Sequence, residues 1–160
     1  MQRRNLLAAM VRFACATPPI PNLALTAAEK AEEEKAAAAR AAAQAARVAY
    51  HLSDLDKVDF VLGNIHNHYA GMNSVGQVTI ALVVHGPALK AFHAATATAK
   101  VNNHVAELRS RGLELAACIN TMRAQNVTLG DLLPGFGVAE QGGVVRLAQL
   151  QSAGYAYLRP

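Results

Sequence analysis

The run VTIALVVHG at residues 78–86 constrains the fold of this chain more than any other feature. It is almost continuously β-branched or aliphatic, and it carries no charged residue. A strand that is apolar on both sides is typical of the inside of a parallel sheet, where helices cover both faces. Pro87 follows directly and suits the first turn of a helix. The run therefore predicts a central strand of an α/β fold.

Around this strand, the spacing of the apolar residues alternates between strand and helix. Further short strands are predicted at residues 47–52, 113–119, 136–140 and 155–158. Helical spacing separates them, at Val58, Val61, Leu62, Ile65 and Tyr69, then at Val101, Val105 and Leu108, around Met122, and at Val144, Leu147 and Leu150. Strands that alternate with helices imply parallel pairing and right-handed crossovers. We predict a three-layer α/β/α domain with a parallel sheet of about five strands.

The 160 residues suit one folded domain, which we place at residues 47–160. Residues 29–46 are rich in alanine and glutamate without a large apolar anchor, so we expect a solvated helical spacer. Residues 1–28 combine a basic start, an apolar stretch and the small-residue sequence ACA, and we interpret them as an export or targeting segment.

The start RRNLL resembles a twin-arginine export signal, although Arg12 interrupts the apolar stretch. A periplasmic location is the favoured interpretation. The alternatives for this segment are an organellar transit peptide, a disordered tail or a misassigned start codon. The alternative location is the cytoplasm. No apolar run approaches the roughly 20 residues that a membrane span requires, so no stable membrane span is expected.

The net charge of +4 does not indicate a nucleic-acid partner. Arg3, Arg4 and Arg12 supply three of these charges, and the chain from Glu29 onward is close to neutral. A protein that binds nucleic acid is expected to keep a basic stripe in its folded part. We therefore predict no nucleic-acid binding.

Three polar, titratable side chains come at the ends of the first three predicted strands: His51, His85 and Cys118. Ligands of open parallel sheets bind outside the carboxyl ends of the strands. If these three strands are neighbours, about 4.8 Å separates each from the next. We therefore predict that the three side chains form one site at this edge.

Cys118 is the candidate catalytic residue. A helix is expected to begin near Asn120 and Thr121, so unpaired N–H groups and the helix dipole would lower the pKa of the thiol. His85 and His51 are candidates for stabilising the thiolate, as imidazolium groups, or for binding a ligand. A structural, inert cysteine and hydrogen-bonded edge histidines are the alternatives. The functional interpretation requires a sulfur atom that is both ionised and reachable.

We predict no metal and no cofactor. His66 and His68 in the HNH sequence are two residues apart on a predicted helix, so their side chains should diverge. A zinc site made of His51, His85 and Cys118 has suitable ligand types but no supporting spacing motif. The glycine pair at residues 142–143 lacks the residues of a phosphate-binding loop.

Five collinear segments resemble the DsrE/DsrF-like family of small sulfur-relay proteins: YHLSD, ALVVHGPALKAF, ELAACINTMRAQNV, LLPGF and GVVRLAQLQSAGYAYLRP. The resemblance covers about residues 49–160. It implies a sheet of order 4-3-2-1-5 and a homo-oligomer, commonly a trimer or hexamer. In sulfur-relay members, one cysteine after the third strand carries a persulfide, and Cys118 falls at that position.

The leading hypothesis is a sulfur-relay-like protein that carries sulfane sulfur as a persulfide on Cys118 and passes it to a partner. Its chemistry would resemble that of a sulfurtransferase. The sulfur donor and acceptor are not identified by the sequence. The alternative is a non-catalytic, oligomeric module that binds a small ligand and has a structural cysteine. Homo-oligomer formation has a physical reason as well. One apolar face of the sheet should be covered mainly by the last helix, and an incompletely covered apolar face is a natural subunit interface.

Overall fold

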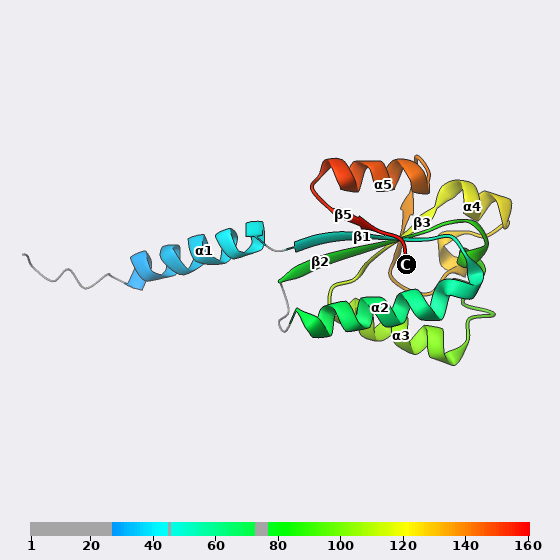
Figure 1. The fold of residues 1–160 in the computed structure, drawn as a ribbon, viewed down its shortest axis with the longest axis horizontal. Helices are drawn as coiled ribbons and strands as arrows, with labels where there is room; N and C mark the ends of the chain where they lie inside the picture. Colours follow the sequence, from blue (N-terminus) through cyan, green and yellow to red (C-terminus); the bar gives the residue numbers. More distant parts are fainter. Residues whose placement is uncertain (1–26, 45, 73–76) are drawn as a thin grey trace, which may run out of the picture.

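The computed structural model describes residues 27–44, 46–72 and 77–160. The segment predicted to direct export, residues 1–28, therefore lies almost entirely outside the described residues. An α-helix, α1 (Ala27–Gln44), occupies the region where we expected a helical spacer, and its side chains at residues 27–36 are exposed. Figure 1 shows α1 extending away from the sheet.

The described residues form a five-stranded parallel sheet in the order β4-β3-β2-β1-β5. Its strands are β1 (Ala46–Leu52), β2 (Val78–Val84), β3 (Glu114–Cys118), β4 (Phe136–Ala139) and β5 (Ala156–Leu158). The predicted α/β fold and strand order are confirmed. In this order β1, β2 and β3 are neighbours, so their carboxyl ends lie side by side.

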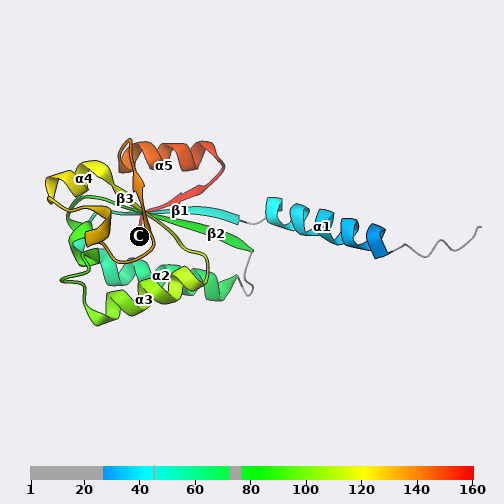
Figure 2. The ribbon, with the colours of Figure 1, turned by 180° about the vertical axis from the view of Figure 1, so that it is seen from behind.

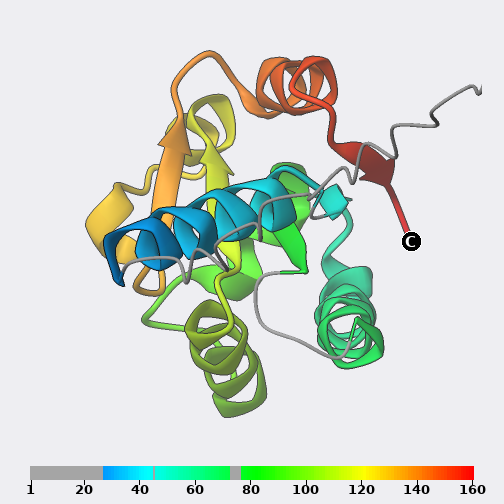
Figure 3. The same cartoon turned by 90° about the vertical axis from the view of Figure 1, so that its left-hand side faces the viewer.

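Helices cover both faces of the sheet and produce three layers. On one side lie α2 (Val58–Gly71) and α3 (Ala99–Ser110), and on the other lies α5 (Gly143–Ser152). Figure 2 shows the same layers from behind, and Figure 3 shows them from the side, with α5 above the sheet and α2 and α3 below it. The short α4 (Ile119–Ala124) follows β3 directly. No helix among the described residues combines the length and the apolar character that crossing a membrane requires.

The described residues also contain three short 3₁₀ helices: η1 (Leu55–Lys57), η2 (Gly86–Phe92) and η3 (Leu129–Asp131). Pro87 thus lies in the first turn of a 3₁₀ helix rather than an α-helix. The next α-helix, α3, begins separately at Ala99, where the side chain of Thr98 accepts a hydrogen bond from the backbone N–H of Val101 at 3.2 Å. This N-cap restarts the helix because it satisfies an N–H group that has no partner within the first turn.

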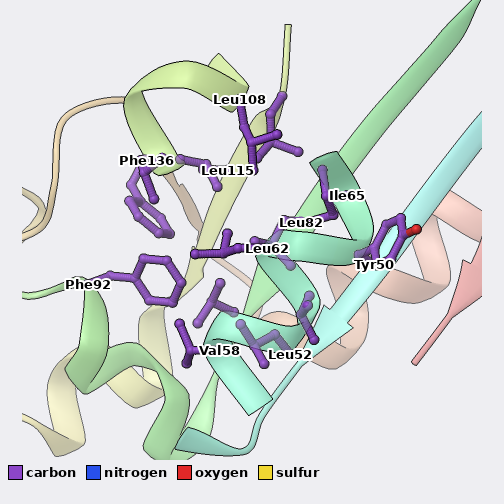
Figure 4. Packing of buried hydrophobic residues seen from close by; sticks show 14 of the residues in the cluster. Tyr50, Leu52, Val58, Leu62, Ile65, Leu82, Phe92, Leu108, Leu115 and Phe136 are labelled. Atoms are coloured by element: carbon purple, nitrogen blue, oxygen red, sulfur yellow. The ribbon is translucent and has the colours of Figure 1, made fainter. Parts of the chain in front are cut away.

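The larger core lies between the sheet and the α2/α3 layer (Figure 4). Leu62 of α2 and Leu82 of β2 are fully buried there, and the rings of Phe92 and Phe136 meet edge to face at 5.3 Å between centroids. Burial of one such aliphatic side chain contributes about 1.5–3 kcal/mol. This core anchors the strands whose carboxyl ends carry the candidate site.

The core under α5 is much smaller. It consists of Ala49, Ala81, Val83, Leu147 and Leu150. Because successive strand residues point to opposite faces, the odd-numbered positions of β1 and β2 face α5 while their even-numbered neighbours face the larger core. As expected, this face is covered mainly by the last helix, α5.

Candidate functional site

The carboxyl edge of the sheet brings His51, His85 and Cys118 together. Val84 of β2 is paired with Ala117 of β3, so the residues that follow them, His85 and Cys118, lie next to each other. His51 is near the end of β1, the neighbour of β2 on the other side. By strand alternation, the three side chains share the face that α5 covers. The predicted grouping of these residues is therefore present in the structure.

Cys118 is the last residue of β3 and the N-cap of α4. Its sulfur accepts hydrogen bonds from the backbone N–H groups of Asn120, Thr121 and Gly143 and from the hydroxyl of Thr121. Since Gly143 is the first residue of α5, the first turns of two helices converge on this sulfur atom. The sequence predicted the donors of α4 but not the one from α5.

Two opposing effects set the pKa of the Cys118 thiol. Burial raises it, but the hydrogen bonds from Thr121, Gly143 and Asn120 together outweigh burial and hold the pKa below its ordinary value. These donors stabilise the negative charge of a thiolate. The site can thus hold an ionised sulfur.

The sulfur is less accessible than the functional interpretation requires. Only 6% of Cys118 is exposed to solvent, because α5 begins directly against it. A Cβ atom built on Gly143 would lie 3.3 Å from the Cβ of Cys118 and 3.3 Å from the Cβ of His85. Glycine at this position allows the close approach. The place of the glycine pair at the start of the last predicted helix is the sequence signal that could have indicated this contact.

The two histidines form a hydrogen-bonded pair. Nε2 of His51 is hydrogen-bonded to Nε2 of His85, and their rings stack with centroids 4.6 Å apart. Nδ1 of His51 is hydrogen-bonded at 2.6 Å to the hydroxyl of Tyr157 on β5. Tyr157 pairs with Ala49 across β1 and β5, so it lies on the same face as the other site residues. Tyr157 is a site residue that the sequence did not predict.

Both imidazoles are neutral near neutral pH. Burial, with contributions from His85 and Arg159, lowers the pKa of His51 to about 4. Burial and Arg159 also lower the pKa of His85. Arg159 is held at this edge by Ser53 and Asp54, at 3.1 and 3.4 Å. The histidines therefore do not act as the cationic neighbours that we expected, and the backbone N–H donors stabilise a thiolate instead.

Asn120 and Thr121 have different parts in the site. Thr121 connects two loops, since its hydroxyl accepts a hydrogen bond from the backbone N–H of Gly86 at 2.9 Å and also binds the sulfur. Asn120 reaches the sulfur only through its backbone N–H. Its side-chain amide lies near Gly142, where an added Cβ would be 3.0 Å from Nδ2.

No group of three or more His, Cys, Asp and Glu side chains is arranged to hold a metal ion in the part of the chain that the structure describes. The two histidines of the HNH sequence diverge. His66 is 3.2 Å from the carboxylate of Glu107, whereas Nδ1 of His68 is hydrogen-bonded to the hydroxyl of Tyr50 at 3.0 Å. Each ring thus has its own partner.

A family model described as the DsrE/DsrF-like family matches residues 23–160. The chain belongs to the DsrE/DsrF-like family. This membership confirms the resemblance drawn from the sequence and places the chain in a family known for sulfur relay. None of the curated proteins matches the chain.

Two solved structures share the fold of this DsrE/DsrF-like chain. The protein of unknown function MTH1491 from Methanobacterium thermoautotrophicum is 30% identical, with a TM-score of 0.63 over 72% of this chain and 99% of that one. The ychN protein from E. coli shares the fold at 13% identity, with a TM-score of 0.57 and the same coverage. Neither comparison assigns a substrate to this chain.

Proposed function

We propose that this DsrE/DsrF-like protein is a sulfur carrier that holds sulfane sulfur as a persulfide on Cys118 and passes it to a partner protein. The observation that carries the proposal is the sulfur of Cys118 at the first turns of both α4 and α5, where it accepts hydrogen bonds from Asn120, Thr121 and Gly143. Family membership supports the same function.

The chemistry requires a nucleophilic thiolate. The Cys118 thiolate attacks the terminal sulfur of a donor R–S–SH, a new S–S bond forms, the donor's S–S bond breaks, and R–S⁻ leaves and takes up a proton. In the second step, an acceptor thiolate attacks the outer sulfur of the Cys118 persulfide, and the Cys118 thiolate leaves. Hydrogen bonds that lower the thiol pKa support both steps, because the thiolate is the nucleophile first and the leaving group later.

The exposed fraction of 6% sets a condition on this function. A donor or acceptor reaches the sulfur only after the segment at residues 139–143, which precedes and begins α5, moves away from Cys118. Transfer is therefore coupled to a local opening of the first turn of α5. Such openings are common in loops that act at binding sites.

Mass spectrometry of the intact protein tests the proposal. After exposure to an alkyl persulfide, the wild-type chain should gain one sulfur atom, and a thiol reductant should remove it. Cys118→Ser should gain none, whereas Cys15→Ser, which removes the other cysteine of the sequence, should gain sulfur as the wild type does. A wild-type chain that takes up no sulfur on Cys118 refutes the proposal.

Burial of Cys118 favours a second candidate, a non-catalytic binding module in which the cysteine only packs. Native alkylation separates the two. A thiol that reacts only after the protein unfolds supports the binding module, whereas a thiol that reacts in the native protein supports the carrier.

We propose in addition that the protein is a homo-oligomer, a trimer or hexamer. Beside α5, the sheet face over β3 and β4 is hollowed by a groove of about 340 Å³, lined by Ala116 and Gly137 and bordered by Glu114 and Arg146. A second subunit packed there would cover apolar surface that α5 leaves open.

A periplasmic location, with export directed by residues 1–28, remains a further proposal, and a cytoplasmic location is its alternative. Determining the first residue of the protein isolated from fractionated cells tests it. A chain shortened by the leader in the periplasmic fraction supports export, and a full-length chain in the cytoplasm contradicts it.

A further inference from the structure

We propose that Tyr157, His51 and His85 form a proton relay that serves sulfur transfer at Cys118, with Tyr157 as the positioning residue that fixes the tautomers of the histidine pair. This inference rests on the proposed carrier function and adds to it a source for the proton that the transfer consumes. It derives from a continuous row of hydrogen bonds across three strands, from β5 through β1 to the end of β2.

The hydrogen bonds restrict where the protons of this row can sit. A neutral imidazole carries one N–H, and in the Nε2–Nε2 hydrogen bond one ring donates while the other accepts. When the Tyr157 hydroxyl donates to Nδ1 of His51, Nε2 of His51 carries the proton and donates to His85. The proton of His85 then sits on Nδ1. Tyr157 therefore determines which nitrogen of His85 is a donor.

The row runs between solvent and the sulfur. Tyr157 is 40% exposed, so its hydroxyl can exchange protons with water. At the other end, His85 lies next to Cys118 in the register of β2 and β3, and the two side chains flank the same residue, Gly143. Burial lowers the pKa of both His51 and His85, which agrees with a relay, since only a neutral imidazole can accept a proton on one nitrogen and donate from the other.

The leaving group of the transfer step takes up this proton. When the Cys118 thiolate takes the terminal sulfur of R–S–SH, the S–S bond of the donor breaks and its electron pair leaves with R–S⁻. His85 gives the proton of Nδ1 to R–S⁻, His51 gives its Nε2 proton to His85, and Tyr157 passes a proton from water to Nδ1 of His51. The products are the Cys118 persulfide and R–SH. No external oxidant is needed, because one S–S bond forms as another breaks.

A comparison of two sulfur donors tests the relay with the full-length chain. An alkyl persulfide releases a basic thiolate that needs a proton, whereas benzenethiosulfonate releases a sulfinate, a weak base that needs none. The variant Tyr157→Phe keeps the ring and removes the hydroxyl. The matched control Tyr155→Phe removes a hydroxyl from a ring that packs against the small core under α5. Mass spectrometry follows the rate at which Cys118 gains sulfur.

We expect Tyr157→Phe to slow transfer from the alkyl persulfide on the order of tenfold, below the roughly 100-fold or more that a direct general acid contributes. Transfer from benzenethiosulfonate and alkylation of Cys118 should keep their wild-type rates, and Tyr155→Phe should resemble the wild type with both donors. Equal slowing with both donors, a changed alkylation rate, or no slowing with either donor overturns the relay while leaving the carrier function intact. A wild-type chain that accepts sulfur from neither donor overturns the carrier function and the relay together.

Discussion

Gly143 of α5 lies against Cys118 of β3, so close that a Cβ atom on the glycine would be 3.3 Å from the Cβ of the cysteine. The same contact brings the backbone N–H of Gly143 to the sulfur, where it helps to hold the pKa of the thiol below its ordinary value. One glycine thereby both covers the sulfur and stabilises its ionised form.

The first prediction concerns this contact. Gly143→Ala inserts a methyl group between Cys118 and His85, moves the start of α5 outward and weakens the hydrogen bond to the sulfur. The pKa of Cys118 should rise, so its alkylation near neutral pH should slow. The pH dependence of the alkylation rate measures this shift.

Gly137→Ala is the matched control for the alanine substitution. Its added Cβ would be 3.7 Å from the backbone oxygen of Leu115, which is an ordinary contact. Gly137→Ala should leave the alkylation profile unchanged. An unchanged profile in Gly143→Ala would show that the α5 donor does not stabilise the thiolate.

The second prediction separates the hydroxyl of Thr121 from its backbone. Thr121→Val removes the donor to the sulfur and the acceptor of the Gly86 N–H, so it should raise the pKa of Cys118. The lost hydrogen bond should also lower the free energy of unfolding by about 1 kcal/mol. Thr121→Ser keeps the hydroxyl and should restore most of both properties. Alkylation and urea denaturation measure them, and identical behaviour of the two variants would contradict the role of the hydroxyl.

The third prediction concerns the dependence of stability on pH. The pKa of His51 falls from its ordinary value of 6.5 to about 4 in the folded protein. The unfolded chain therefore binds a proton that the folded chain does not bind as the pH falls through 6.5 towards 4, and stability is lost in this window. Above 6.5, His51 is neutral in both states and has no effect on the pH dependence.

Because His51 is only half-buried, solvent reduces this contribution to about 1 kcal/mol. Urea denaturation at about pH 7 and about pH 5 measures it, since these values lie on either side of the unfolded pKa. His51→Gln should lose less stability over this interval than the wild type. An equal loss in both proteins would mean that His51 titrates normally in the folded state.

The fourth prediction tests the larger core. Leu82→Ala removes a fully buried side chain from the central strand and should lower the free energy of unfolding by about 2–5 kcal/mol. Leu129 is 43% exposed, and Leu129→Ala should change stability by no more than about 0.5 kcal/mol. Chemical denaturation of both variants provides the comparison. An equal loss of unfolding free energy in the two variants would mean that Leu82 does not belong to the buried core.

The fifth prediction tests the proposed subunit interface. Ala116→Glu places a carboxylate in the groove over β3 and β4, so it should convert the oligomer to a monomer without unfolding it. Phe60→Glu changes an exposed residue of α2, in the layer on the opposite side of the sheet, and should leave the mass unchanged. Light scattering measures both. A wild-type monomer at micromolar concentration would refute the interface.

Several features of the fold followed from residue patterns alone. The apolar run in β2 and the helical spacing of Val58, Val61 and Leu62 predicted alternating strands and helices, because burial selects side chains with the period of each element. The same local patterns placed His51, His85 and Cys118 at one edge, since parallel strands have their carboxyl ends on the same side of a sheet.

The sequence by itself thus determined the layers, the parallel sheet and the three side chains at its carboxyl edge. Only the tertiary structure decided that Gly143 closes over the sulfur, that Tyr157 reaches His51, and that both imidazoles are neutral. These properties depend on how β5 pairs with β1 and where α5 meets β3. Distances between residues far apart in the chain, and the loss of water around them, arise from packing and leave no periodic pattern in the sequence.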